Sequence, residues 1–501
     1  MAKAVGIDLG TTNCVVAVLE GGRPVVIANA EGMRATPSVL AFKEKKPLIG
    51  QIAKRQATLN PERTIYSLKR FIGRRYREVT EEIKTVPYSV VSGQNETVRF
   101  EIDDKLYSPE ELSAMLLRKL IDDASSYLGE AVHDVVISVP AYFNDSQRRG
   151  TMDAARIAGL NVLRIINEPT AAALAYGLPR KTTETILVFD LGGGTLDVSV
   201  LDVSDDVFEV RATAGDTQLG GCNFDKEVAE WLTVEFEKRH GINLRHDKQA
   251  LQRLTEAAEK AIIELSTVLE TQIYLPFICT DAAGPKHLEV VLKRAQLNEL
   301  TAHLLKSCRD SLEAALAEAK ITPDDVDQVL FVGGSTRILA VQELVQKIIG
   351  KRKINRGVNP DEAVALGAAI QAGILTGELK ELILLDITPF SLELETEGGL
   401  ISKVIEQNTA IPTRKTRLFS TTEDNRSAVD LHILQGDPKL AKENRRVRQF
   451  RLDEIVRTHP GHALVELTFE IDANGLFNVS AKDNKTGKEH PLIISDSVNM
   501  D

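Results

Sequence analysis

The feature that most constrains the fold of this chain is a short motif that occurs twice. Residues 6–13 read Gly-Ile-Asp-Leu-Gly-Thr-Thr-Asn, and residues 188–197 read Val-Phe-Asp-Leu-Gly-Gly-Gly-Thr-Leu-Asp. Each copy is an apolar strand that ends in Asp-Leu-Gly with a threonine close behind. One such string has little specificity, because turns are rich in Asp and Gly. Two copies, each opening an α/β half, predict a duplicated two-lobed domain with a site in the cleft between the lobes.

The chemistry of these turns favours a phosphate ligand over a pair of plain tight hairpins. Glycine lets the backbone approach a ligand, and successive free N–H groups form an anion-binding concavity. Threonine hydroxyls add donors, and an aspartate at the strand end suits a divalent cation. A third glycine-rich turn, Gly333-Gly334-Ser335-Thr336-Arg337, also follows a strand. Facing turns that carry Asp8 and Asp190 would hold a Mg²⁺-polyphosphate from both sides, whereas the P-loop and Rossmann signatures are absent from the sequence.

Length and composition set outer bounds on the architecture. The chain has 501 residues, which corresponds to about three domains at roughly 150 residues each. It is 43% hydrophobic and 27% charged, which is typical of a globular protein, and only 5% aromatic, so the cores must consist of Ile, Leu, Val and Ala. The formal net charge of −11 argues against nucleic acid as a partner, because that affinity needs a basic face.

Cysteine spacing and hydropathy bear on the compartment. Cys14, Cys222, Cys279 and Cys308 are far apart and form no C-x-x-C pair, so we expect neither a disulfide framework nor a structural zinc site. The N-terminus enters a strand at once, without a secretory leader. No apolar stretch reaches the ~18 residues that a membrane helix needs. These features predict a soluble, cytoplasmic protein without a membrane partner.

Strand and helix patterns alternate up to about residue 380, which favours an α/β fold with buried sheets. Strands are expected at 4–7, 134–139, 185–190 and 329–332, and helices at 108–128, 146–158, 225–240 and 341–349. From Ile387 onward, short alternating strands and turn signals predict an all-β antiparallel domain. A leucine-rich run is usually core, but the run at residues 378–386 lies at this change of pattern, which favours a docking linker.

The three turns and the strings around them resemble the DnaK-type heat-shock chaperones, whose ATPase domain has the actin-like, two-lobed fold. The resemblance covers residues 3–495 and includes specific strings such as Asn167-Glu168-Pro169-Thr170-Ala171-Ala172. The matching strings are residues 6–13, 139–143, 167–172, 190–197, 333–337, 359–364, 382–386, 408–413 and 469–483. The implied fold class is an α/β two-lobed actin-like (ribonuclease H-like) ATPase domain followed by an all-β antiparallel sandwich.

The resemblance also implies a domain division. Residues 1–380 would form the ATPase domain, with lobe I at about 1–182 and 355–380 and lobe II at about 183–354. Residues 381–386 would be the interdomain linker, residues 387–495 the β-sandwich domain, and residues 496–501 a tail.

By this resemblance, the chain is an ATP-dependent molecular chaperone. It would bind and hydrolyse ATP to switch its affinity for extended apolar segments of unfolded polypeptides. The implied cofactors are ATP or ADP with Mg²⁺, and K⁺ is a further candidate. The implied partners are unfolded or extended polypeptides, a J-domain co-chaperone and a nucleotide exchange factor, and the expected state is a monomer.

The resemblance assigns roles in the ATPase site. Asp8 and Asp190 would organise Mg²⁺ through its waters, and Lys69 would reach the γ-phosphate and the attacking water, where its ammonium stabilises developing charge. Taken alone, Lys69 would be read as a solvated surface lysine. Glu168 and Asp197 would orient water or metal, and Thr195 completes the catalytic set. The remaining nucleotide contacts would come from Gly10, Thr11, Thr12, Asn13, Gly192, Gly193, Gly194, Thr195, Glu259, Ser266, Gly333, Gly334, Ser335, Arg337 and Asp361, with Arg337 stacking on the base.

Further residues would connect the nucleotide to the β-domain. The interdomain relay would consist of Pro140, Arg148, Leu382, Leu384, Leu385 and Asp386. Arg164, Asn167 and Thr170, together with the linker, would meet a J-domain. The peptide groove would be lined by Phe390, Leu392, Leu394, Phe419, Val429 and Leu431, although the same period-two spacing is typical of any sandwich core.

Several residues depart from the family pattern. Ile262 stands where a lysine usually touches the ribose, and Gln407 stands where a basic residue usually faces the linker Asp386. We therefore expect weakened nucleotide affinity and an impaired interdomain salt bridge. Glu397 and Thr422 are polar at groove positions that are usually apolar. Cys14 replaces the usual serine, as a packed thiol, and Cys222-Asn223 replaces an acidic pair.

After residue 494 there is no sequence for the helical lid of the family, and we expect faster peptide exchange because a lid mainly lowers the dissociation rate. Three competing functions remain. An actin-like filament former would lack the β-domain, and a sugar kinase would need a carboxylate base beside an alcohol pocket. The third, a degenerate ATP-binding regulatory scaffold with weakened interdomain coupling, is supported by Ile262 and Gln407.

Overall fold

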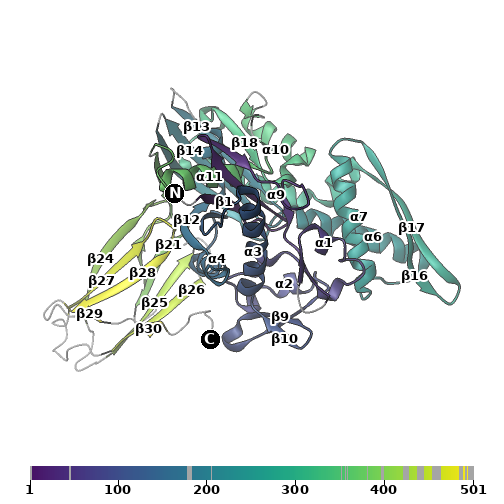
Figure 1. The fold of residues 1–501 in the computed structure, drawn as a ribbon, viewed down its shortest axis with the longest axis horizontal. Coiled ribbons are helices and arrows are strands. Elements are labelled where there is room, and N and C mark those ends of the chain that lie inside the picture. Colours follow the sequence, from purple (N-terminus) through teal and green to yellow (C-terminus); the bar gives the residue numbers. More distant parts are fainter. Residues whose placement is uncertain are drawn as a thin grey trace.

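A computed structural model describes residues 3–43, 47–177, 183–204, 206–350, 353–355, 357, 359–380, 382–396, 400–420, 428–436, 445–453, 464–483, 489–490 and 493–494. Two large helix-covered sheets, with smaller sheets beside them, form the part up to α11 (Ala363–Leu375), and the elements described after β20 (Ile383–Ile387) are strands (Figure 1). The predicted α/β two-lobed class followed by an all-β domain is confirmed.

Lobe I is built on a sheet in which β1 lies centrally. β1 pairs in parallel with β11 and antiparallel with β2. The strand order is β12 (Asn161–Asn167), β11 (Asp134–Val139), β1 (Ala4–Asp8), β2 (Asn13–Glu20), β3 (Arg23–Val26), with β4 (Thr36–Pro37) paired to β2. Aliphatic side chains of β1 and β11 pack against α3 (Pro109–Leu128) and α4 (Asp145–Ile157). The C-terminal end of β1 thereby places Asp8 at the edge of a rigid core.

Lobe I also carries two smaller sheets and short helices. One sheet has the order β10 (Lys105–Tyr107), β9 (Val98–Ile102), β8 (Ser89–Ser92), and the other β6 (Pro47–Ile49), β5 (Leu40–Phe42), β7 (Thr64–Ile65). The short helices are α1 (Gln51–Lys54) and α2 (Thr80–Ile83). A cluster rich in aromatic rings, including the edge-to-face pair of Phe71 and Phe100, packs these parts together. Lys69 lies in the 3-10 turn Leu68–Arg70 that this cluster supports.

Lobe II is built on a second sheet that starts with the second copy of the motif. Its order is β19 (Ile354–Asn355), β18 (Gln328–Val332), β13 (Glu184–Leu191), β14 (Leu196–Ser204), β15 (Val207–Asp216), β20 (Ile383–Ile387), β23 (Ala410–Ile411). The register sets Asp190 opposite Asp197. The same core holds the hairpin of β16 (Glu270–Asp281) and β17 (Gly284–Lys293) and the helices α6 (Gly221–His240), α7 (Lys248–Leu265), α8 (Arg294–Leu300), α9 (Ala302–Ala319) and α10 (Leu339–Ile349).

Two helices join the lobes. α5 (Glu168–Tyr176) and α11 pack on each other, and their alanine-rich faces share one core with strands of both sheets. Because Ala side chains are small, the two helices approach closely and leave the sheets in fixed relation. α11 follows lobe II in the sequence yet packs on β1, so the chain crosses between the lobes twice.

The β-domain is a sandwich of two antiparallel sheets. One has the order β22 (Leu400–Ile405), β21 (Ser391–Thr396), β25 (Ala428–Gly436), β26 (Arg445–Asp453), β30 (Ile493–Ile494), and the other β24 (Thr413–Ser420), β27 (Leu464–Ile471), β28 (Phe477–Asp483), β29 (Glu489–His490). Leu394, Ile433, Leu467 and Phe469 are fully buried between them. The expected linker is strand β20, which pairs in parallel with β15 and antiparallel with β23, so one sheet continues from lobe II into the β-domain.

Local sequence signals account for the starts of two helices of lobe I. Ser108 and Asn144 cap α3 and α4, as expected for capping boxes with Glu111 and Gln147. α6 starts four residues earlier than the apolar periodicity predicts, because the N–H groups of Gly221 and Cys222 donate to the carbonyls of Gly192 and Gly193. Within the described ranges, no helix combines the length and the apolar character that crossing a membrane requires.

Candidate nucleotide site

The first turn leaves β1 at Asp8, and hydrogen bonds from Ser38, directly after β4, hold its backbone. The N–H of Ser38 donates to Thr12 O at 2.9 Å, and the Ser38 hydroxyl donates to Gly10 O at 2.7 Å. Ser138, at the end of β11, donates to Asp8 Oδ1 at 3.4 Å. Cys14 is fully buried and lies 3.2 Å from the Ser38 hydroxyl, which fits the expected packed thiol. The turn is therefore fixed before any ligand arrives.

The second turn interlocks with the first across the cleft. An added Cβ on Gly193 would collide with the Thr12 hydroxyl, and one on Gly194 would lie 2.6 Å from the Thr11 hydroxyl. Glycine is needed here because the threonines of the first turn occupy the space that a side chain would fill. The two copies of the motif are thus complementary, since one supplies hydroxyls and the other supplies room for them.

Four carboxyl groups gather around these turns. Glu168, Asp190 and Asp197 are buried and Asp8 is half-buried. Burial and the neighbouring Glu168 raise the pKa of Asp8, and the same causes, with Asp197 and Asp8 nearby, raise the pKa of Asp190 well above its usual value. Burial, together with Glu168, raises the pKa of Asp197 to about 7. Such crowding disfavours the charged forms unless a cation is present.

Lys69 is the cation that faces this cluster. It forms an ion pair with Glu168 in which both side chains are only 8% exposed, and its ammonium lies 6.0 Å from the Phe143 ring centre. Burial lowers its pKa, but Glu168 and Asp8 more than offset that effect, so the pKa of Lys69 is raised. A lysine that the sequence alone would leave in solvent is therefore a buried, charged member of the site.

The carboxyl cluster fits a divalent cation carried by a polyphosphate. Asp197 accepts a hydrogen bond from Tyr142 N at 3.2 Å through Oδ1, while its buried Oδ2 has no hydrogen-bond partner among the described residues. In the described part of the chain, no three His, Cys, Asp or Glu side chains converge closely enough to bind a metal directly. The phosphate-facing donors of the turns and the excess of carboxylates over Lys69 suit an ion held through water.

The third turn lies beside the second and carries Arg337. The Ser335 hydroxyl donates to Gly192 O at 2.9 Å, and Gly333 adopts φ 78°, which favours glycine. Arg337 donates to Asp361 Oδ2 at 2.6 Å and to Asn359 Oδ1 at 3.1 Å. The structure therefore brings together the predicted residues of all three turns.

Contacts across the rim hold the lobes closed. Lys54 of α1 pairs with Glu259 of α7 at 3.0 Å, and Thr58 donates to Glu256 at 3.0 Å. The Ser266 hydroxyl donates to Ile262 O within its own helix. Ile262 itself is 6% exposed and packs in the lobe II core. It therefore lies among apolar side chains, where the burial of an aliphatic residue is favourable.

Lobe I contacts the β-domain through Arg148, which lies next to the turn that binds Asp197. Its guanidinium is buried and donates to Phe143 O, Ala141 O, Asn167 Oδ1 and Asn474 O. The Asn474 side chain accepts from Ile165 N at 2.9 Å, and Asp145 accepts from Phe477 N at 2.9 Å. The buried Pro140 begins the turn whose carbonyls Arg148 binds.

The linker docks on lobe I as well. Asp386 accepts from the Thr170 hydroxyl at 3.1 Å, and burial raises its pKa, although Arg148 opposes this. Leu382 and Leu384 pack against the shared core, whereas Leu385 is exposed. Gln407 does not face Asp386. It donates to Glu318 of lobe II at 3.2 Å, and Asn408 does the same at 3.1 Å. At the position where we expected an impaired salt bridge, Gln407 thus makes an amide contact to lobe II. Asp386 binds lobe I without residue 407.

The candidate peptide residues lie in different settings. Phe390 packs edge-to-face on Tyr142 of lobe I, with ring centres 5.1 Å apart, while Leu392 and Leu394 are buried in the sandwich core. Phe419, Val429 and Leu431 lie in β24 and β25, but their side chains are outside the described part of the chain, as are Glu397 and Thr422.

Sequence reasoning missed three members of the site. Arg70 donates to Gly194 O and to the Asn223 side chain across the cleft. Ser38 holds the first turn through a hydrogen bond to Gly10 O, and the N–H of Tyr142 donates to Asp197. Arg70 had a signal in its position next to Lys69, and Tyr142 lies in the matching string 139–143. Ser38 meets the site through tertiary contacts that the local pattern does not reveal.

Comparison with known proteins gives a consistent result. A family model described as Hsp70 protein matches residues 4–501. Chaperone protein DnaK of Thermus thermophilus is 57% identical over 502 residues, which is 100% of this chain and 82% of the relative. Chaperone protein dnaK of Cyanidioschyzon merolae is 57% identical over 504 residues (100% of this chain, 83% of the relative), and that of Cyanophora paradoxa is 58% identical over 496 residues (99% and 80%).

Proposed function

This chain belongs to the Hsp70 family, and we propose that the cleft between its lobes is where it binds and hydrolyses ATP. The protein is an ATP-dependent molecular chaperone and an ATP hydrolase that works with a Mg²⁺-bound nucleotide. The observation that carries the site assignment is the buried cluster of Asp8, Glu168, Asp190 and Asp197 around Lys69, at the point where the two copies of the motif interlock.

The chain's own groups divide the work in the cleft. Mg²⁺ would neutralise phosphate charge, held through water by Asp8 and Asp190. Lys69 would stabilise the charge that develops on the transferring phosphoryl group, and its buried pair with Glu168 supports this because few waters compete there. Asp197, with one buried oxygen that has no hydrogen-bond partner in the described part of the chain, would orient the attacking water or a metal. K⁺ is proposed as a second ion near the same carboxylates.

The hydroxyls and backbone of the turns would bind phosphate. This role belongs to Thr11, Thr12 and Thr195, with Gly10, Asn13, Gly192, Gly193 and Gly194. Glu259, Ser266, Gly333, Gly334, Ser335, Arg337 and Asp361 would line the adenosine end. The contact of Arg337 with Asp361 supports this, since it holds the guanidinium beside the third turn. Ile262 would support the ribose side by packing only.

We propose that Arg148, Pro140 and the docked linker pass the nucleotide state to the β-domain. Arg148 supports this role because it binds the turn before α4 and Asn474 of the β-domain at once. The protein binds unfolded polypeptides and co-chaperones. We propose that the peptide is bound by six apolar side chains of the β-domain, namely Phe390, Leu392, Leu394, Phe419, Val429 and Leu431. Arg164, Asn167 and Thr170 would meet the J-domain, and a nucleotide exchange factor is a further proposed partner.

We also propose the finer organisation and setting. The division into residues 1–380, 381–386 and 387–495 is supported by the change from α/β to all-β structure near β20. The net charge of −11 disfavours binding to nucleic acid, and repulsion between like-charged copies supports a monomer. A cytoplasmic location is supported by the free thiols of Cys14, Cys222, Cys279 and Cys308, which suit a reducing compartment.

Single-turnover ATP hydrolysis, with and without an unfolded apolar peptide, tests this function. We expect hydrolysis that the peptide accelerates, and strong loss of hydrolysis in Lys69→Ala and Thr195→Ala with ADP binding retained in Lys69→Ala. The control Arg156→Gln removes an exposed ion pair with Asp153 on α4 and should behave like the parent. Full hydrolysis in both site variants would contradict the assignment.

A further inference from the structure

An outer loop of lobe I connects the two ends of the nucleotide cleft. Residues 29–36 leave β3 and return to the sheet through β4, where Thr36 pairs with Cys14 and Pro37 with Asn13. Ser38, directly after β4, binds the backbone of the first turn at Gly10 and Thr12. One end of this loop is therefore part of the support of the phosphate end.

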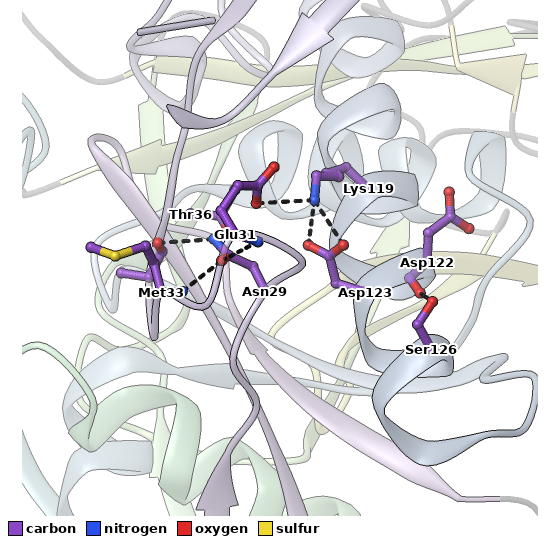
Figure 2. A network of polar contacts seen from close by, with 9 residues as sticks. Asn29, Glu31, Met33, Thr36, Lys119, Asp122, Asp123 and Ser126 are labelled. Atoms are coloured by element: carbon purple, nitrogen blue, oxygen red, sulfur yellow. Dashed lines mark hydrogen bonds and ion pairs between the residues drawn. The ribbon is translucent and has the colours of Figure 1, made fainter. Parts of the chain in front are cut away.

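The loop has an internal framework of its own, which Figure 2 shows. The Asn29 side chain accepts from the N–H groups of Glu31 and Met33 and donates to the Thr36 hydroxyl at 3.0 Å. Lys119 of α3 pairs with Asp123 at 2.7 Å and reaches Glu31 at 3.4 Å. Because a side-chain amide and a helix both hold it, the loop is a defined structure rather than an unsupported connection.

The other end of the loop reaches the turn before α11. Arg34 grips Glu362 with two parallel hydrogen bonds, Nε to Oε1 at 2.6 Å and Nη2 to Oε2 at 2.8 Å. The Glu362 side chain is only 14% exposed, although Arg34 is largely exposed. Such a two-pronged contact fixes direction as well as distance. Its hydrogen bonds also lower the pKa of Glu362, which keeps this carboxylate charged.

The turn that Glu362 belongs to supports the adenosine end of the cleft. Pro360 O accepts from Gly333 N at 2.9 Å, and Asn359 and Asp361 both accept from Arg337. The Asn359 side chain also accepts from Asp361 N at 3.2 Å. Movement of residues 359–362 would therefore move both the third turn and the guanidinium of Arg337.

We propose that Arg34 is a positioning residue for nucleotide binding, which acts from outside the cleft through Glu362 on the turn that orients Gly333 and Arg337. The inference rests on the proposed nucleotide site. Because the Arg34 side chain pairs with Glu362 at the adenosine end, it sets how long nucleotide stays bound and leaves the hydrolysis of bound ATP to Lys69.

The test measures release of a fluorescent ADP by stopped flow, and single-turnover hydrolysis of prebound ATP, in the full chain. Arg34→Gln and Glu362→Gln should release ADP about fivefold faster with unchanged hydrolysis of bound ATP. Arg34→Lys should not restore slow release, because an ammonium cannot form the two-pronged contact. Arg34→Glu combined with Glu362→Arg should restore most of it.

The matched control is Arg245→Gln, which removes a guanidinium that also grips a glutamate, Glu230, but lies outside all three turns. ADP release from Arg34→Gln equal to that from Arg245→Gln, while Arg337→Ala releases ADP faster, would overturn this inference alone. If Arg337→Ala also leaves release unchanged, the proposed adenosine end is wrong and the inference falls with it. Should Arg34→Gln lower the unfolding temperature more than Arg245→Gln, the reversed pair decides: slow release with a normal unfolding temperature supports the proposal, and fast release overturns it.

Discussion

The two interfaces of lobe I, with lobe II and with the β-domain, satisfy their buried polar groups in opposite ways. Toward lobe II, Asp8, Glu168, Asp190 and Asp197 share one buried ammonium, Lys69, and Asp197 keeps an oxygen without a partner among the described residues. Toward the β-domain, Arg148 directs its donors at four protein acceptors. At the first interface the carboxylates outnumber the cations. At the second, the hydrogen-bond donors of the buried guanidinium are satisfied by protein acceptors.

This difference explains where a ligand can change the molecule. Uncompensated buried carboxylates destabilise the fold until a cation and its phosphates arrive, so ligand binding releases a large electrostatic penalty. The satisfied hydrogen bonds of Arg148 instead couple the positions of lobe I and the β-domain, because they break only when one of the two moves. Each prediction below perturbs one of these two interfaces.

The largest effect is expected from removing the ammonium of Lys69 from the cleft cluster. Lys69→Ala should lower single-turnover ATP hydrolysis by about 100-fold or more, because a donor aimed at developing charge is lost. ADP should still bind, since the turns remain. The rim variant Lys54→Ala, which breaks the pair with Glu259, should change ADP release but not hydrolysis of bound ATP. Near-normal hydrolysis in Lys69→Ala would show that the cluster is not catalytic.

Asp197→Asn should make the nucleotide-free protein more stable while it impairs hydrolysis. The pKa of Asp197 is raised from 3.8 to about 7 in the fold. Between these pH values, the folded state holds a proton that the unfolded state has lost, so the native carboxyl becomes increasingly destabilising as the pH rises. The stabilisation by asparagine should be near zero at pH 4 and on the order of 4 kcal/mol at pH 8.

Urea unfolding followed through Trp231, the single tryptophan, reports on lobe II and checks this prediction. Saturating Mg²⁺ and ADP should shrink the difference between Asp197→Asn and the parent. A stabilisation that is equal at pH 4 and pH 8 would mean that the carboxyl charge is not its cause.

Gly193→Ala should weaken ADP binding about tenfold, because the new Cβ meets the Thr12 hydroxyl and pushes the interlocked turns apart. Gly192→Ala is the matched comparison, since its Cβ would meet nothing closer than 3.8 Å, and it should cost less. Adding Thr12→Gly to Gly193→Ala should recover part of the affinity. Calorimetric titration with ADP measures all three, and equal losses for Gly192 and Gly193 variants would contradict the interlock.

The smallest effect is expected at the interface between lobe I and the β-domain. Asn474→Ala removes the acceptor for Ile165 N and should reduce the difference in peptide affinity between the ATP and ADP states about threefold. Asn474→Asp keeps the acceptor and adds a charge beside Arg148, so it should preserve or enlarge that difference. Fluorescence anisotropy of a labelled apolar peptide reads both, and basal ATP hydrolysis serves as the control that should stay constant.

Much of the architecture follows from local signals, but not the helix starts that tertiary contacts set. The caps of α3 and α4 are written in Ser108 and Asn144, whereas α6 starts at Gly221 because the second turn supplies acceptors for its first N–H groups. Ile262 shows that burial in the fold can override an expectation taken from the family pattern. Its place in the family pattern suggests a ribose contact, yet the fold buries it in the lobe II core.

The sequence by itself determined the fold class and the three glycine-rich turns, because strand periodicity, glycine and Asp-Leu-Gly are properties of neighbouring residues. Only the tertiary structure decided that Lys69 is buried against Glu168, that Thr12 fills the space beside Gly193, and that Gln407 faces Glu318 instead of Asp386. These pairs lie far apart in the chain. Burial and electrostatic strength depend on what surrounds a side chain in space, and no local pattern encodes that.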